Sequence, residues 1–218
     1  MLQQLAVSFG ERSDSEAASK QAAYLKNHFP FFGLKAPERR EIQKEIFKKY
    51  PLKTEKELIE VVFSLYQEKE REFHYAAIDL CHKYRKCVSQ LDFIEQLITT
   101  HSWWDSVDLI ASNLLGFYLI QAPKELKMMD EWIGSKNLWK RRSALIFQLK
   151  WKEKTDCKRL FSYCLQCGHE REFFIEKAIG WALRELSKTF PQIVDTFIIE
   201  NQQLFSPFTK KEACKLIS

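Results

Sequence analysis

Two tryptophans and two aspartates stand close together in residues 101–118, HSWWDSVDLIASNLLGFY, a stretch that otherwise has the apolar spacing of a buried helix. With Ser102 as N-cap, one continuous apolar face is predicted from Trp103, Val107, Ile110 and Leu114. Trp104 is turned by about 100° from Trp103, and Asp108 follows Trp104 by four residues. One indole and one carboxylate therefore share a second helix face, where together they can stabilise positive charge.

The composition predicts a helical protein. The chain has 218 residues, 45% of them hydrophobic, with only 6 Gly and 6 Pro, and is rich in Leu, Glu, Lys, Gln and Ala. No basic segment followed by an apolar one opens the chain, and no run of 18 apolar residues occurs, so we expect no membrane span and a cytoplasmic location.

Helical segments are expected in six pairs, joined at breaks where the six prolines stand. The predicted pairs are 14–28 with 38–50, 55–69 with 72–84, 88–100 with 103–121, 123–134 with 138–151, 155–167 with 171–188, and 190–203 with 207–217. The second helices repeat at 34 residues, as when ERREIQKEIFKKY from Glu38 returns as EFHYAAIDLCHKY from Glu72.

Such a repeat predicts an all-α fold, a right-handed α-solenoid of about six HEAT-like helical hairpins with a concave binding face. The tetratricopeptide signature, which has the same period, is absent. A single domain is expected over residues 1–218. Residues 1–13 are expected to be an extension, either poorly ordered or a short helix.

One position of the repeat is polar in every copy: Arg40, His74, Asp108, Arg142, Glu176 and Lys210. This column predicts a solvated surface along the solenoid, with His74 as a surface or capping residue. Trp104 and Trp181 stand in columns that hold no other indole, so they either fill gaps in the stack or serve a site.

The net charge of +5 permits a nucleic-acid partner without requiring one, and each basic cluster alone can be a solvated helix face. The six cysteines are expected to be reduced thiols. Cys157, Cys164, Cys167 and His169 offer an alternative, a zinc site, but a lone CxxC near a helix end is weak evidence and no metal is expected.

Four motifs in order along the chain carry a resemblance to a known family: YLKNHFPFFGLKAPER from Tyr24, SWWDSVDLIA from Ser102, NLWKRRSALIFQLKWKEK from Asn137 and REFFIEKAIGWALREL from Arg171. Together they resemble the AlkD-type DNA alkylation-repair glycosylases, which are built from HEAT-like repeats. The likeness covers essentially the whole chain. It places the family's key aromatic, acid, arginine and second aromatic on Trp104, Asp108, Arg142 and Trp181, whereas Lys35 stands where the family is associated with glutamine.

The resemblance implies a monofunctional glycosylase that removes cationic N3- and N7-alkylated purines from double-stranded DNA without flipping the base. A cationic base leaves as a neutral molecule, so no general acid is needed, and Asp108 would stabilise the oxocarbenium sugar and orient water. Trp104 and Trp181 would face the same sugar. Arg142 would contact a phosphate. Weaker DNA-binding candidates are Tyr24, Lys35, Arg39, Arg40, Lys140, Arg141, Phe173, Phe174, Lys177 and Arg184. No cofactor is expected, and the protein would be a monomer, associated with the bacterial nucleoid when bound to DNA.

Two other classes of protein stay open, a non-catalytic DNA-structure-binding relative and a protein-binding HEAT scaffold. The first is favoured if Asp108 or either tryptophan points into the core, and an Asp108 carboxylate locked in an internal ion pair would overturn the enzymatic interpretation. The second predicts an apolar groove. There is also a geometric difficulty, because helices pack about 8–10 Å apart and Asp108 would lie roughly 20 Å from Trp181 in a straight stack.

Overall fold

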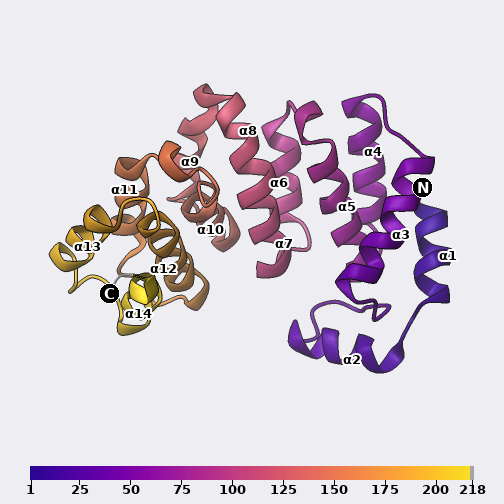
Figure 1. Ribbon diagram of the computed structural model, residues 1–218, viewed down its shortest axis with the longest axis horizontal. Coiled ribbons are helices and arrows are strands. Elements are labelled where there is room, and N and C mark those ends of the chain that lie inside the picture. Colours follow the sequence, from indigo (N-terminus) through magenta and orange to yellow (C-terminus); the bar gives the residue numbers. More distant parts are fainter. Residues whose placement is uncertain (217–218) are drawn as a thin grey trace. The chain divides into compact units, whose positions relative to one another are not determined.

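The computed structural model describes residues 1–216, which form helices and loops and contain no strand (Figure 1). The last two positions of the predicted domain and the end of the predicted helix 207–217 lie outside the described residues. The prediction of an all-α chain is confirmed. Its residue contacts divide it into two compact units, Met1–Ser89 and the part from Gln90 onward. None of the described helices combines the length with the apolar composition needed to cross a bilayer.

Unit 1, the part up to Ser89, contains five α-helices and a short 3-10 helix. They are α1 (Leu2–Glu11), α2 (Ser15–Tyr24), α3 (Ala36–Lys49), α4 (Glu55–Tyr66), α5 (Arg71–Lys83) and η1 (Arg85–Cys87). Asp14 and Thr54 cap α2 and α4 by accepting hydrogen bonds from backbone N–H groups, as their short polar side chains favour.

The first helix belongs to the core of unit 1. Leu5 and Phe9 of α1 are fully buried. The ring of Phe9 lies 5.9 Å from that of Phe32 and 5.6 Å from that of Phe73, measured between ring centroids. Residues 2–11 are therefore a helix, as one of the two predicted alternatives had it, and the helix is packed in the core.

A buried carboxylate fixes the loop that leads into α3. Glu72 accepts hydrogen bonds from the backbone N–H groups of Phe32, Gly33 and Leu34, at 3.1, 2.9 and 3.2 Å. Gly33 has φ +96°, and a Cβ there would lie 2.1 Å from the carbonyl oxygen of Asp14, so only glycine fits. This anchoring sets where α3 begins.

His74 is buried, and the prediction of a surface or capping histidine is wrong. Its Nε2 lies 2.9 Å from the carbonyl oxygen of Glu68, and its Nδ1 lies 3.0 Å from Nη1 of Arg71. The Tyr66 ring packs against it at 5.2 Å. The predicted solvated column is therefore interrupted, because His74 and Arg142 are buried while Arg40 is exposed and the other members are partly buried.

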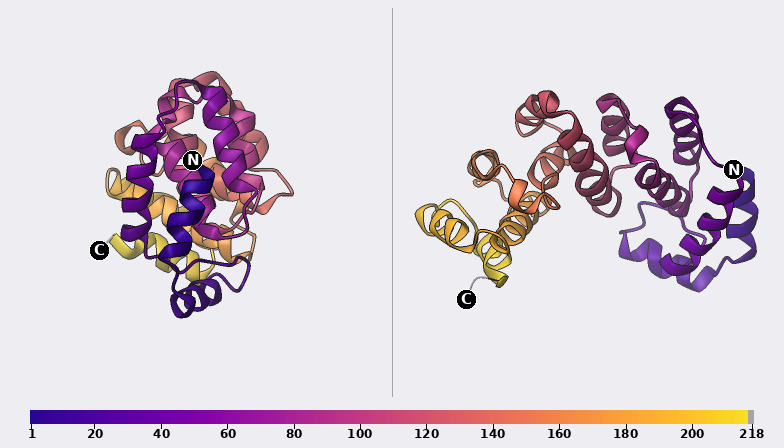
Figure 2. Two further views of the ribbon diagram at one scale, coloured as in Figure 1. Left: turned by 90° about the vertical axis from the view of Figure 1, so that its right-hand side faces the viewer. Right: turned by 45° about the horizontal axis from the view of Figure 1, so that its top comes forward.

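Unit 2, from Gln90 onward, holds the remaining helices, arranged mainly as antiparallel neighbours (Figures 1 and 2). Up to Trp132 they are α6 (Leu91–Thr99), α7 (Trp104–Leu109), the π-helical η2 (Ile110–Leu115), α8 (Gly116–Gln121), the 3-10 helix η3 (Pro123–Leu126) and α9 (Lys127–Trp132). From Leu138 they are α10 (Leu138–Ile146), the 3-10 helix η4 (Lys152–Lys154), α11 (Cys157–Cys167), α12 (Phe173–Ser187), α13 (Pro191–Glu200), α14 (Pro207–Ala213) and the 3-10 helix η5 (Cys214–Leu216).

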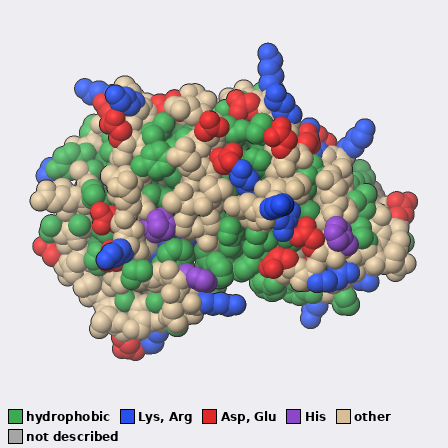
Figure 3. Space-filling model, turned by 180° about the vertical axis from the view of Figure 1, so that it is seen from behind, with side chains coloured by type: hydrophobic (Ala, Val, Ile, Leu, Met, Phe, Trp, Pro, Cys, Tyr) green, Lys and Arg blue, Asp and Glu red, His purple; other side chains and the backbone are tan. Residues whose placement is uncertain are grey.

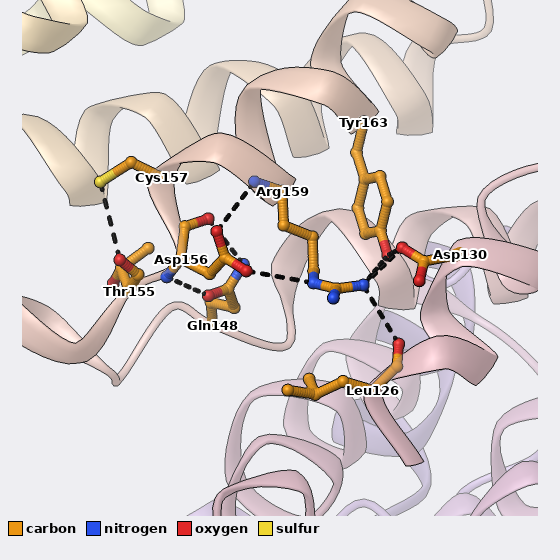
Figure 4. A network of polar contacts seen from close by, with 8 residues as sticks. All are labelled: Leu126, Asp130, Gln148, Thr155, Asp156, Cys157, Arg159 and Tyr163. Carbon is orange, nitrogen blue, oxygen red and sulfur yellow. Dashed lines mark hydrogen bonds and ion pairs between the residues drawn. The ribbon is translucent and has the colours of Figure 1, made fainter. Parts of the chain in front are cut away.

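A network of polar contacts connects α9 and α11 in unit 2 (Figure 4). Asp130 accepts a hydrogen bond of 2.6 Å from the Tyr163 hydroxyl and forms an ion pair with Arg159. Burial and the neighbouring Asp130 raise the pKa of the Tyr163 phenol, which stays protonated as a donor. Asp156 caps α11 and joins the same arginine at 3.3 Å, and its backbone N–H donates to Gln148 at 2.7 Å. Because these side chains are used for structure, this network is not a candidate site.

Candidate functional site

Asp108 lies one helical turn after Trp104 on α7, and both side chains are half-buried. Immediately afterwards the chain adopts the π-helical conformation of η2, which shifts the register of the following residues and is often found at functional sites. The hydroxyl of Ser112 donates to the carbonyl oxygen of Asp108 at 2.7 Å, within this altered turn. The sequence pattern predicted the shared face of Trp104 and Asp108 but gave no sign of the π-helix.

The carboxylate of Asp108 forms a bidentate ion pair with Arg142 of α10. Nε donates to Oδ1 and Nη2 donates to Oδ2, each at 2.7 Å. Nη1 of the same guanidinium donates to the carbonyl oxygen of Phe174 in α12. The Arg142 side chain is 2% exposed and that of Asp108 is 15% exposed, so the arginine is enclosed while the acid keeps a small open surface.

This geometry gives Arg142 a different role from the predicted phosphate contact. Nε, Nη1 and Nη2 of its guanidinium each donate a hydrogen bond within the protein, and its side chain has almost no access to solvent. The ion pair is also the observation that the sequence analysis held against catalysis by Asp108. Arg142 instead fixes the orientation of the carboxylate, because a bidentate pair holds both oxygens in the plane of the guanidinium.

Burial raises the pKa of Asp108 above the ordinary value of an aspartate, since desolvation penalises the charged form. The hydrogen bonds and charge of Arg142 act in the opposite direction, and the positive charge of Lys177 adds to them. The neighbouring Asp105 raises the pKa further. With a permanently charged guanidinium bound to both oxygens, the carboxylate is the form present at neutral pH.

An aromatic cluster holds together the starts of α7, α10 and α12. The Trp103 ring lies 5.7 Å from Trp139 and 5.2 Å from Phe174, and Trp139 and Phe174 are 5.2 Å apart. Phe173, which is half-exposed, continues the cluster at 5.3 Å from Phe174 and stacks on Phe208 at 5.5 Å. Phe174 is thus a packing residue whose carbonyl also binds Arg142, whereas the ring of Phe173 remains accessible.

Lys177 and Trp181 follow on α12 at intervals of four residues after Phe173 and share one helix face. Lys177 is exposed, its Nζ lies 5.6 Å from the Phe173 ring centroid, and Trp181 is half-buried. Gly180 allows α14 to approach, because a Cβ at this position would lie 2.6 Å from Glu212. The hydrogen bonds from Arg142 to both Asp108 and Phe174 link α7 and α12 through α10.

Most other predicted cations of unit 2 form ion pairs with acids of other helices or loops. Lys140 pairs with Glu95, Arg141 with Glu170 at 3.0 Å, and Arg184 with Glu212. Among the predicted cations in the described part of unit 2, only Lys177 forms no ion pair. Of these predicted cations, Lys177 is the one that is exposed without an acidic partner.

The remaining predicted residues lie in unit 1. Tyr24, at the end of α2, is exposed, and so are Lys35 and Arg40 near the start of α3. Arg39 is buried, with its guanidinium 4.6 Å from the Tyr75 ring centroid and 3.3 Å from Asp79, so its side chain is used within the unit.

The cysteines are separate thiols, and among residues 1–216 no group of three or more His, Cys, Asp or Glu side chains could hold a metal ion. Burial raises the pKa of Cys167 to about 12, and charge repulsion from Glu170 adds to the effect. This thiol is therefore protonated at neutral pH.

Sequence reasoning missed the acidic partners Glu95, Glu170, Glu212 and Asp79. Each lies between 28 and 45 residues from its cation, and three of the four partners lie on helices other than the immediate neighbour in the chain. The one signal in the sequence was the 34-residue interval between Asp108 and Arg142, which placed them on adjacent repeats.

Comparison with known proteins places this chain among repair proteins. A family model described as a DNA alkylation repair enzyme matches residues 6–217. A solved structure titled a predicted DNA alkylation repair enzyme from Enterococcus faecalis is 35% identical, covers 94% of this chain and 97% of its own, and superposes with a TM-score of 0.86. AlkD2 from Streptococcus mutans shares the fold, at 22% identity, 92% and 99% coverage and a TM-score of 0.65. No curated protein matches the chain.

Proposed function

Because this chain belongs to the DNA alkylation repair enzyme family, we propose that it is a DNA glycosylase acting on cationic N3- and N7-alkylated purines in duplex DNA. The observation that supports this most strongly is the half-buried carboxylate of Asp108, held in a fixed orientation by Arg142 and accompanied on its helix face by Trp104. An anion fixed in this way can stabilise a cation that forms beside it.

The reaction needs little else from the protein. A purine alkylated at N3 or N7 carries a positive charge and leaves as a neutral base, so the positive charge moves to the deoxyribose in the transition state. Asp108 stabilises that oxocarbenium ion and orients a water molecule toward C1′. A preorganised electrostatic group of this kind typically contributes about 3 kcal/mol. Neutral lesions, which need protonation to leave, are expected to be poor substrates.

The ion pair with Arg142 is compatible with this role but weakens the electrostatic stabilisation that Asp108 can give to a cation. A carboxylate offers about four acceptor positions, and Arg142 occupies two of them. About two remain for water or for a cationic sugar. The positive charge of Arg142 also reduces the negative potential that Asp108 presents, so Arg142 is a positioning residue.

The two indoles are proposed to contact the sugar from either side. Trp104 lies on the same helix face as Asp108, and Trp181 follows Lys177 by one turn of α12. An aromatic face near a cation contributes about 0.5–2 kcal/mol. Lys177 takes the phosphate contact first predicted for Arg142, because its exposed ammonium is not paired with an acid in the described structure. The base is proposed to leave without being extruded into an enclosed pocket.

A non-catalytic DNA-binding protein is the second candidate, and the buried ion pair is the observation that favours it. If Asp108 serves only to hold α7 against α10, the charge pair is structural and the exposed residues Lys177 and Phe173 would bind DNA without chemistry. Both candidates predict binding to duplex DNA, but only the first predicts release of a base.

Incubation of the wild-type protein with duplex DNA containing N7-methylguanine separates the two. We expect release of the free base well above the uncatalysed rate, and much weaker release from a duplex with a neutral lesion such as 1,N6-ethenoadenine. Binding to the same duplex with release at the uncatalysed rate would support the second candidate and refute the glycosylase proposal.

A further inference from the structure

A basic groove lies between α3 and α5, within unit 1 and apart from the residues around Asp108. Its volume is about 310 Å³. The residues that line it are Arg40, Gln43, Lys44, Phe47, Asp79 and Lys83. Of these residues, only Arg40 was among the predicted DNA-binding candidates. On the face of the molecule seen in Figure 3, cations and acids are interspersed.

The floor of the groove is polar and internally paired. Gln43 is buried, and with its amide oriented to satisfy both groups it donates to Asp79 Oδ2 at 3.0 Å and accepts from the backbone N–H of Ala76 at 3.2 Å. Nη2 of the buried Arg39 donates to the same oxygen at 3.3 Å. The single acid of the groove is therefore bound to two donors from α3, and its charge is compensated.

The edge of the groove carries exposed positive charge. Arg40 and Lys44 are four residues apart on α3, so their side chains are neighbours on one helix face. Lys83 comes from α5, with its Nζ 5.8 Å from the Phe47 ring centroid. Of the exposed acids on α3, Glu45 is turned by about 100° from Lys44, whereas Glu41 is turned by about 100° from Arg40 and only about 60° from Lys44.

We propose that this groove binds consecutive phosphates of the DNA backbone, an inference that rests on the proposed function. Its cations come from two helices, α3 and α5, and more than one of them can contact a polyanion strand at the same time. Contacts of this kind position the duplex without reading its sequence.

The test is the salt dependence of binding to an undamaged duplex. One variant removes the three edge charges, Arg40→Gln with Lys44→Gln and Lys83→Gln. A matched control removes three exposed lysines elsewhere in unit 1, at positions 53, 56 and 69, by the same substitution. Both variants lose the same net charge, and none of the six residues belongs to the proposed reaction site.

Each phosphate contact contributes about 0.9 to the slope of log K against log salt. We expect the groove variant to show a slope less steep by about 2–3 and at least ~10-fold weaker binding near ~100 mM salt, with the control close to wild type. Equal losses in the two variants would show that only net charge matters, and an unchanged groove variant would exclude the contact. Both results overturn the inference.

Two further measurements separate this inference from its premises. Inorganic phosphate, added at constant ionic strength, should displace the duplex no better than chloride, and selective displacement that disappears in the groove variant would identify a small-anion site instead. Base release by the wild type under single-turnover conditions is measured alongside. Normal release with unchanged binding of the groove variant would refute the groove alone, whereas the expected binding change without base release would refute the glycosylase.

Discussion

Replacing Asp108 by asparagine keeps the shape of the side chain but leaves the guanidinium of Arg142 buried without its anion. An arginine cannot lose its proton to relieve this, and a side chain that is 2% exposed cannot turn to water. Breaking a buried ion pair in this way costs about 3–5 kcal/mol. Because domains are stable by only about 5–15 kcal/mol, we expect a large loss in the free energy of unfolding.

The opposite substitution, Arg142→Met, should cause a smaller loss in the free energy of unfolding than Asp108→Asn. Asp108 is 15% exposed and its pKa is already raised by burial, so it can be hydrated or take up a proton. The substitution also removes the hydrogen bond to the carbonyl oxygen of Phe174. In the double variant no unpaired charge remains, and its loss should be smaller than the sum of the two single losses by about 2–3 kcal/mol.

Urea unfolding followed by tryptophan fluorescence measures these energies. All six tryptophans lie after residue 102, so the signal reports on unit 2. Asp79→Asn, which disrupts the pair with Arg39 in unit 1, is the control and should leave the fluorescence transition of unit 2 nearly unchanged. Additive losses in the Asp108 and Arg142 cycle would refute the conclusion that this pair is a coupled structural unit.

Three other predictions follow from the same structure. Excision should be lost as pH falls through the raised pKa of Asp108, at a higher pH than the value near 3.9 of an ordinary aspartate would give, because the carboxylate is the active form; a single-turnover pH profile checks this. Gly116→Ala should destabilise unit 2 by at least ~1–3 kcal/mol, since the new Cβ would lie 2.2 Å from the carbonyl oxygen of Phe147; an unchanged urea midpoint would contradict the close contact. Glu72→Gln should cost unit 1 about 1–3 kcal/mol by weakening three hydrogen bonds from the loop before α3, as amide hydrogen exchange of that loop would report.

The helices of the fold could be predicted well from the sequence because apolar spacing, capping residues and prolines act locally. The predicted helix 55–69 corresponds to α4 and 171–188 to α12, with ends shifted by a few residues. A short helix was one of the two alternatives for the N-terminal residues, but its packing in the core could not be predicted, because it rests on only two fully buried side chains. The π-helix at Ile110–Leu115 could not be predicted either.

The candidate site could be predicted only in part. The four-residue interval placed Asp108 beneath Trp104, because the two residues lie on the same helix. The 34-residue interval placed Arg142 one repeat away, but whether such a neighbour faces solvent or the adjacent helix depends on packing. A charged residue in the sequence does not reveal its partner, so Arg39 and Arg142 could not be distinguished in advance from an exposed cation such as Lys177.

The most direct test of the proposed role of Asp108 is single-turnover release of N7-methylguanine by the Asp108→Asn variant, at protein concentrations that saturate the duplex and under conditions where the variant is folded. The Asp130→Asn variant, which also disrupts an arginine–carboxylate pair but lies outside both proposed sites, is the matched control. Since the carboxylate contributes about 3 kcal/mol, we expect a loss of about 100-fold or more for Asp108→Asn with DNA binding retained, and a near wild-type rate for the control. A folded, DNA-binding Asp108→Asn variant that releases the base at the wild-type rate would contradict the proposal.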